Sequence, residues 1–175
     1  MIDENFIKFI VNLKAESVPQ SIQILDPYSN KESVRVTKLF YKKFFNDHNK
    51  RILLFGINPG RLGGGLTGIP FTDPYHLEKS CGISTKLDTK KELSSTFIYE
   101  MIDMYGGPKL FYEKFLVTSI CPYGFTREGK NLNYYDEKRL EKKWRKKIIE
   151  WIETQKNLLS DNSCCVLIGK GKNQK

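Results

Sequence analysis

Apolar residues along this chain follow two different spacings. Where they recur every three or four positions we expect a helix with one buried face, and where they form a short continuous run we expect a buried strand. The helical spacing predicts helices over about residues 5–14, 93–105 and 136–152. A capping-box spacing over Ser29–Glu32 predicts a further helix that continues to about Phe45. We also expect His48 to belong to the end of this helix.

Three short apolar runs predict strands at Arg51–Ile57, Phe115–Ile120 and Ser163–Ile168. Because strands alternate with helices, the fold class is α/β, with a mostly parallel central sheet covered on both faces, a three-layer α/β/α sandwich. In such sheets ligands bind beyond the carboxyl ends of the strands. We therefore expect the loops after Gly56, Ile120 and Gly169 to meet at one edge and to carry the chemistry.

Two of the predicted helices have a well-marked apolar face. In the helix over 93–105 the face consists of Leu93, Phe97, Met101 and Met104, and in the last helix of Leu140, Trp144, Ile148, Trp151 and Ile152. We expect both faces to pack against the sheet.

Length and composition indicate one globular domain over residues 1–175. A chain of 175 residues with 39% hydrophobic residues can form a single packed core. No stretch approaches the ~20 apolar residues that cross a bilayer, and the N-terminus lacks a basic signal-peptide start. We expect a cytosolic, monomeric protein that is not bound to membranes.

The four cysteines, Cys81, Cys121, Cys164 and Cys165, lack a C-x-x-C spacing. We interpret them as buried free thiols, and we expect neither a metal site nor a cofactor. A net charge of +9 favours a polyanionic partner such as DNA. Much of that charge lies in Lys138–Lys147, which is also typical of the solvated face of a helix.

The segment "ILLFGINPGRLGGGLTGIPF" at Ile52–Phe71 combines a strand with a loop of six glycines. A phosphate-binding loop of the G-x-x-x-x-G-K-[ST] type is excluded, because Leu66 stands where the lysine is needed. A dinucleotide-binding fingerprint is disfavoured because the glycines begin well after the strand and run into Ile69-Pro70. Binding of a nucleotide cofactor therefore remains a minor alternative.

The same segment resembles motif one of the uracil-DNA glycosylase superfamily. "GINPG" followed by "TGIPF" is most similar to the single-strand-selective monofunctional (SMUG) type, in its divergent bacterial branch. "FLVTSICPYGFTREGKNL" is similar to the family's second-strand segment, and "CVLIGKGKNQK" to the strand and turn before its second motif. The resemblance covers most of the chain from Arg51 onward.

The resemblance implies a monofunctional DNA repair glycosylase that hydrolyses the N-glycosidic bond of a damaged base and needs no cofactor. It implies that Asn58 positions the attacking water and that Phe71 stacks on the flipped base. Without the resemblance, Asn58 could equally cap the turn before Pro59, and Phe71 could simply pack in the core. Base binding would also involve Gly56, Ile57 and Ser119.

Ser119 stands where we align the family's base-reading Asn. A hydroxyl is shorter than an amide and can donate or accept, so we expect weaker uracil selectivity and activity on bases such as xanthine or hydroxymethyluracil. The glycine loop and the C-terminal turn would contact DNA through Gly60, Arg61, Gly63, Gly64, Lys170 and Lys172. In the interpretation based on the glycosylase family, the glycines after Gly60 form a flexible wall beside the segment Gly56–Gly60.

The superfamily's second motif, an H-P-S-P-R-like loop, has no counterpart before Lys175. We expect the chain to be a fragment that lacks a closing strand, rather than a reduced relative. Asp73-Pro-Tyr-His76 resembles the water-activating motif of other uracil-DNA glycosylases, but it lies 15 positions after Asn58, and we interpret Asp73 as part of an ordinary turn. The main alternative function is a non-catalytic nucleic-acid-binding module.

Overall fold

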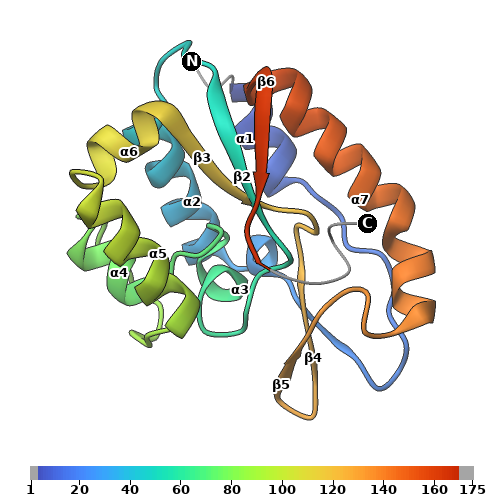
Figure 1. The fold of residues 1–175 in the computed structure, drawn as a ribbon. Helices are drawn as coiled ribbons and strands as arrows, with labels where there is room; N and C mark the ends of the chain where they lie inside the picture. Colours follow the sequence, from blue (N-terminus) through green and yellow to red (C-terminus); the bar gives the residue numbers. More distant parts are fainter. Residues whose placement is uncertain (1–3, 170–175) are drawn as a thin grey trace.

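The computed structural model describes residues 4–169, and the side chains of residues 6–157 and 165–169. Its central sheet consists of β2 (Arg51–Gly56), β3 (Phe115–Ser119) and β6 (Ser160–Leu167) in the order β3-β2-β6 (Figure 1). Both pairings are parallel, and Leu54 lies opposite Val117 on one side and Val166 on the other. The predicted parallel sheet of an α/β fold is confirmed.

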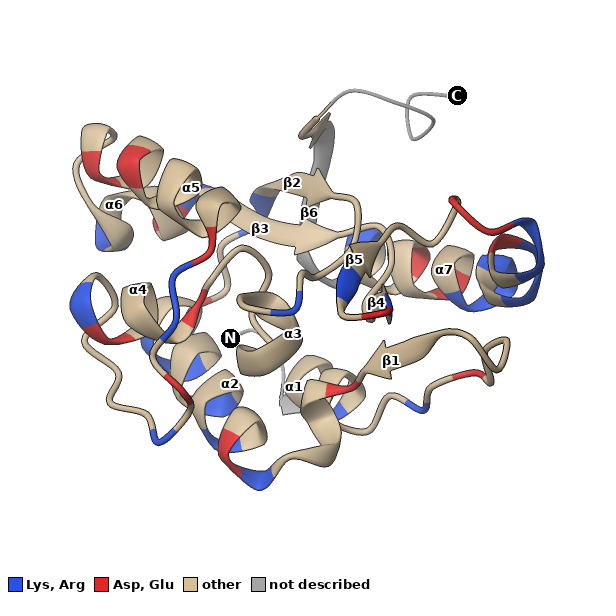
Figure 2. Cartoon of the chain, turned by 90° about the horizontal axis from the view of Figure 1, so that it is seen from below, with Lys and Arg blue, Asp and Glu red and all other residues tan. Residues whose placement is uncertain are grey.

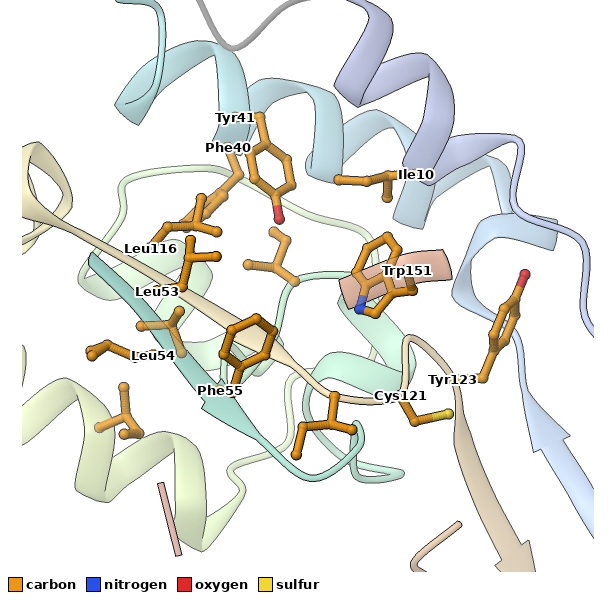
Figure 3. Close-up of a cluster of buried hydrophobic side chains, with 14 of the residues drawn as sticks. Ile10, Phe40, Tyr41, Leu53, Leu54, Phe55, Leu116, Cys121, Tyr123 and Trp151 are labelled. Atoms are coloured by element: carbon orange, nitrogen blue, oxygen red, sulfur yellow. The ribbon is translucent and has the colours of Figure 1, made fainter. Parts of the chain in front are cut away.

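Helices lie on both faces of this sheet. On one side are α1 (Glu4–Val11) and α2 (Lys31–Phe44), and on the other is α5 (Leu93–Met104) (Figures 1 and 2). Leu53 and Leu116 point toward Phe40 and Tyr41 of α2 (Figure 3), and all four are buried. Alternate residues of β2 therefore serve two different packing layers, as a strand buried on both faces requires.

One tryptophan of the long helix α7 (Lys138–Leu159) contacts both the sheet and α1. The indole ring of Trp151 stacks on Phe9 with ring centroids 5.6 Å apart, and its Nε1 donates a hydrogen bond of 2.7 Å to the carbonyl oxygen of Ser119. Because Ser119 is the last residue of β3, this bond joins α7 to the strand end where chemistry is expected.

A second, antiparallel sheet was not expected from the sequence. It consists of β1 (Gln23–Leu25), β4 (Gly124–Arg127) and β5 (Lys130–Leu132) in the order β1-β4-β5. Its strands have three or four residues, too few to show an alternating pattern. The remaining short elements are η1 (Pro27–Ser29), α3 (Gly64–Thr67), α4 (Pro74–Lys79) and α6 (Pro108–Lys114).

The predicted start and end of the second helix are wrong in detail. Asn30, and not Ser29, caps α2, because its Oδ1 accepts hydrogen bonds from the backbone N–H groups of Glu32 and Ser33. Glu32 does not complete a capping box, since its carboxylate binds Arg35 at 2.7 and 2.8 Å. The helix ends at Phe44, so His48 lies outside it.

The predicted apolar face of α5 is wrong for three of its four residues, whereas Met101 is half-buried and packs against the core. Leu93 is 91% exposed, Phe97 63% and Met104 90%, whereas Ile98 and Ile102 are buried. Compared with the prediction, the helix is rotated about its axis, so that Ser95 and Tyr99 are buried together with those two isoleucines. Two large apolar side chains are thereby left facing solvent at the start of α5.

The thiol prediction holds for two cysteines. Cys81 and Cys121 are free and buried, but Cys165 is exposed, and the side chain of Cys164 lies outside the described residues. Burial raises the pKa of the Cys81 and Cys121 thiols to about 12, so both remain protonated at neutral pH. Cys165 lies in β6 and lines an open groove next to α7.

The Trp151 bond can be tested by the change Trp151→Phe, with Trp144→Phe as a matched control. Trp144 is buried, and its Nε1 has no hydrogen-bond partner among the described residues. Both changes remove similar ring area, but only Trp151→Phe leaves a carbonyl unpaired, at a cost of about 1–3 kcal/mol. We expect chemical denaturation to show the larger loss of unfolding free energy for Trp151→Phe; equal losses would contradict the assigned role of the bond.

Candidate active site

The loops that follow the three parallel strands meet at one edge of the sheet, as predicted. The backbone N–H of Ile120 donates to the carbonyl oxygen of Gly56 at 2.9 Å, and that of Ile168 donates to Phe55 at 2.7 Å. These bonds hold the residues after β3 and β6 against the end of β2. A cleft of about 480 Å³ opens there, within the size range of ligand pockets.

The cleft combines residues that follow β2 and β6 with residues at the start of α5, in β5 and just after β5. It is lined by Ile57, Asn58, Gly60, Phe71, Glu92, Leu93, Ser94, Phe97, Ile98, Asn131, Asn133, Ile168 and Gly169. A small cavity of about 20 Å³ shares part of this lining and is bounded by Asn58, Pro59, Gly60, Phe71, Glu92, Ser94 and Ser119. The predicted residues Asn58, Phe71 and Ser119 are thus brought together around one cavity.

The side-chain amide of Asn58 is held by the chain that follows β5. Its Oδ1 accepts a hydrogen bond of 3.1 Å from the backbone N–H of Tyr134, and its Nδ2 donates to the carbonyl oxygen of Leu132 at 3.3 Å. An amide oxygen has two lone pairs, so Oδ1 can still accept a bond from a water molecule. The antiparallel sheet therefore fixes the orientation of the residue on which the predicted chemistry depends.

The ring of Phe71 lies directly against the end of β2. A Cβ atom on Gly56 would overlap the ring at Cε2 and Cζ, so a residue with any side chain at this position would displace Phe71. Phe71 also adopts a positive φ of 53°, which is rare for an aromatic residue and indicates local strain. The glycine and the strained turn together hold a half-buried aromatic ring beside Asn58.

Ser119 lies opposite Gly56 in the pairing of β2 with β3 and is 2% exposed. Its carbonyl oxygen accepts the bond from Trp151, which fixes the backbone at the point where the side chain borders the small cavity. Ile57 is half-buried and lines the cleft. The predicted base-binding residues therefore all lie at this edge of the sheet.

The prediction of a flexible glycine wall is wrong. Gly64 and Gly65 begin the short helix α3, and Gly63 and Gly64, which we expected to contact DNA, are buried. Gly60 is half-buried and Arg61 is exposed. Lys170 and Lys172 lie outside the described residues.

The close neighbour of this loop is a carboxyl group. A Cβ atom on Gly60 would overlap Oε1 of Glu92, and one on Gly63 would overlap Oε2. Two of the six glycines are therefore explained by a side chain of the same protein that rests on the backbone. The sequence did not indicate that Glu92 would lie against this loop.

Glu92, Ser94, Asn131 and Asn133 line the cleft and were not among the predicted site residues. Asn131 belongs to the "GKNL" turn quoted above, and its Oδ1 accepts a bond of 3.0 Å from the backbone N–H of Arg61. The sequence gave less indication that Glu92 belongs to the site, since its one notable feature is that it directly precedes the predicted helix over 93–105. Only the packing of α5 against the glycine loop identifies it.

The interpretation of Asp73 as part of an ordinary turn is wrong, because its side chain is fully buried and joins two segments of the chain. Asp73 caps α4, and its Oδ1 accepts hydrogen bonds of 2.8 Å from both the backbone N–H and the Nδ1 of His76. Its Oδ2 accepts a bond of 2.7 Å from the backbone N–H of Glu92. His76 is buried against Tyr99, with ring centroids 4.8 Å apart, so neither residue lines the cleft.

Exposed cations surround this edge of the molecule. Figure 2 shows Lys and Arg on α7, on β5 and in the chain between α4 and α5. Arg61, Lys91 and Lys130 are exposed close in sequence to residues that line the cleft. Within residues 4–169, no group of three or more His, Cys, Asp or Glu side chains could hold a metal ion, and no helix could span a membrane.

A larger groove of about 560 Å³ lies between α7 and β6 and is mostly apolar. It is lined in part by Phe55, Ile120, Ile152 and Leu167. None of the predicted site residues borders it, so the candidate site is the cleft at the end of β2.

The chain is similar to a known protein family over most of its length. The model of the family described as the uracil DNA glycosylase superfamily matches residues 42–175, which include every residue of the cleft. A search of curated proteins finds no match. Among solved structures, the chain is similar to the wild-type SMUG2 protein of Pedobacter heparinus, with 41% sequence identity and a TM-score of 0.90. The match covers 98% of this chain and 76% of that chain.

The contact between Gly56 and Phe71 can be tested by Gly56→Ala. We expect the added methyl group to overpack the site and to lower the free energy of unfolding by about 1–3 kcal/mol. Phe71→Leu shortens the opposing side chain, so Gly56→Ala will cost less in the Phe71→Leu background. A double-mutant cycle from thermal or chemical unfolding measures this coupling, and additive effects would contradict the contact.

Proposed function

Because the chain belongs to the uracil DNA glycosylase superfamily, we propose that it is a monofunctional DNA glycosylase that removes damaged bases such as uracil, hydroxymethyluracil or xanthine. The main observation in support is that Asn58 and Phe71 share a cavity with Ser119 at the carboxyl end of β2. The 41% identity to the Pedobacter heparinus SMUG2 protein over nearly the whole chain gives further support.

The first step is extrusion of the damaged nucleotide, which costs a few kcal/mol of unstacking and unpairing. Stacking of the base on Phe71 offsets this cost by about 1–3 kcal/mol, by analogy with proteins that bind single strands. The cations around the cleft neutralise phosphates and so hold the backbone on either side. Leu93 and Phe97, exposed at the cleft, offer apolar surface next to the extruded base.

The chemical step is attack of water on the anomeric carbon of the sugar. Asn58 cannot remove a proton from water, because an amide is not basic at neutral pH, but its Oδ1 can accept a hydrogen bond and orient the water molecule. Its own bonds to Tyr134 and Leu132 keep that oxygen in place. Orientation of this kind suits a reaction in which the base departs first and leaves an oxocarbenium-like sugar.

The product would be an abasic site in an intact strand. A glycosylase that also cuts the strand needs an amine nucleophile that forms a Schiff base with the sugar. Among the described residues that line the cleft and the small cavity there is no lysine. This lining supports monofunctional hydrolysis.

A non-catalytic DNA-binding module is the second candidate. It is favoured by the fact that both polar atoms of the Asn58 amide already bind backbone groups, as a purely structural residue would. The net charge of +9 supports DNA binding in either case.

Excision from DNA followed by alkaline cleavage tests the proposal. We expect the protein to release uracil or xanthine from a single-stranded oligonucleotide, and Asn58→Ala to slow the reaction by about 100-fold or more, since a misplaced water reacts poorly. Asn46→Ala, at an exposed residue outside the cleft, is the matched control and should keep the wild-type rate. Binding without cleavage by the wild-type protein would favour the module.

Selectivity can be tested at Ser119. Ser119→Asn introduces a rigid donor and acceptor at the cavity wall, and we expect it to raise the ratio of uracil to xanthine excision by about 10-fold, which corresponds to about 1.4 kcal/mol. Ser119→Ala, which only removes the hydroxyl, should lower both rates without this shift. An unchanged ratio in Ser119→Asn would show that Ser119 does not read the base.

A further inference from the structure

Four polar side chains from three elements border the small cavity of about 20 Å³. Asn58 follows β2, Ser119 ends β3, and Glu92 and Ser94 lie at the start of α5. A space of this size holds about one water molecule, provided that polar groups surround it. The cavity is therefore a site for a single bound water beside Asn58.

The carboxyl group of Glu92 is held in a fixed position at this cavity. Its backbone N–H donates to Oδ2 of the buried Asp73 at 2.7 Å, which anchors the residue. Its two carboxyl oxygens rest on Gly60 and Gly63, where any side chain would displace them. Two glycines of the loop and one buried aspartate thus fix the position of one carboxyl group.

The surroundings of this carboxyl group make it a better proton acceptor than an exposed glutamate. Burial raises the pKa of Glu92, and the negative charge of Asp73 acts in the same direction. A hydrogen bond from Ser94, the charge of Arg61 and the N–H of Leu62 lower the pKa, but by less. The neighbouring Lys91 directs its ammonium group over the ring of Tyr75, at 3.9 Å from the centroid.

We propose that Glu92 and Asn58 together hold the attacking water and that Glu92 accepts its proton. This inference rests on the proposed glycosylase function and adds a residue to it. An amide can only orient water, whereas a carboxylate on the same cavity can also increase its nucleophilicity. The negative charge of Glu92 would further stabilise the positive charge that develops on the sugar.

The step is balanced in atoms and charge. The glycosidic bond breaks, and its electron pair leaves with the base. The water oxygen forms a new bond to the anomeric carbon, and one water proton passes to the carboxylate of Glu92. The departing base takes up a proton from solvent, and Glu92 returns its proton to solvent, so the net reaction is hydrolysis.

The test is single-turnover excision of uracil or xanthine as a function of pH, with the 175-residue chain and excess protein over oligonucleotide. For the wild-type protein we expect the rate to rise with pH through a pKa above the ordinary glutamate value of 4.5, because the carboxylate form is required. Glu92→Gln should be about 100-fold slower at neutral pH and should lose this dependence. Glu100→Gln, on the exposed side of α5, is the matched control and should keep the wild-type profile.

Two further measurements separate catalysis from structural support. Binding of Glu92→Gln to the same oligonucleotide, followed by fluorescence anisotropy, should equal or exceed wild-type binding, because a negative charge has been removed. Added formate should restore part of the rate of Glu92→Ala by replacing the missing carboxylate. The role of Glu92, but not the proposed function, would be overturned if the wild-type rate did not fall at low pH. The same holds if Glu92→Gln had the rate and the pH profile of the wild type. A wild-type chain that binds DNA and releases neither base would overturn the proposed function, and this inference with it.

Discussion

The candidate site depends on the contact between the Phe71 ring and the backbone of Gly56. The end of β2 is a glycine without a side chain, so the Phe71 ring can lie against its backbone. Phe71 adopts a strained φ of 53° in this position. If the ring moved away, the cavity beside Asn58 would lose one wall. The strain is maintained by the surrounding structure, because Thr67 and Thr72 on either side of Phe71 are buried and the Thr67 hydroxyl donates to the Thr72 carbonyl oxygen at 2.6 Å.

Around this contact the protein uses backbone geometry more than charge to position its polar groups. The amide of Asn58 is oriented by Tyr134 and Leu132, and Ser119 is fixed through the bond from Trp151 to its carbonyl oxygen. Glu92 is held between two glycines and bound by Asp73 through its N–H. Each of these partners comes from a distant part of the chain, so the site is assembled by the whole fold. Preorganisation of this kind is what positioning of one water molecule requires.

The electrostatics of the site follow from burial next to a second carboxylate. Asp73 is fully buried, and its charge adds to the effect of burial in raising the pKa of Glu92. A carboxyl group in such a place is a stronger base than one in water, at the cost of some stability when it is ionised. Arg61, an exposed cation close to the cleft, acts in the opposite direction and lowers the pKa of Glu92 in part.

The sequence alone predicted the parallel strands β2, β3 and β6, the long helices between them, and the convergence of their loops at one edge. These follow from continuous apolar runs and helical periodicity, which local chemistry determines. It also indicated Asn58 and Phe71, because their motif is contiguous and its spacing is distinctive. That the chain belongs to the superfamily agrees with this resemblance.

Only the tertiary structure decided the rotation of α5, the antiparallel sheet that holds Asn58, and the place of Glu92. The predicted face with Leu93, Phe97 and Met104 is exposed because the opposite face, which carries Ser95, Ile98, Tyr99 and Ile102, packs against the core. The strands β1, β4 and β5 are too short to leave a pattern. β4 pairs with β5, which follows it directly, and β1 joins them by pairing with a segment about 100 residues away. Glycines in a loop are consistent with the close approach of another group to the backbone. The identity of that group depends on long-range packing, which cannot be predicted from the sequence pattern alone.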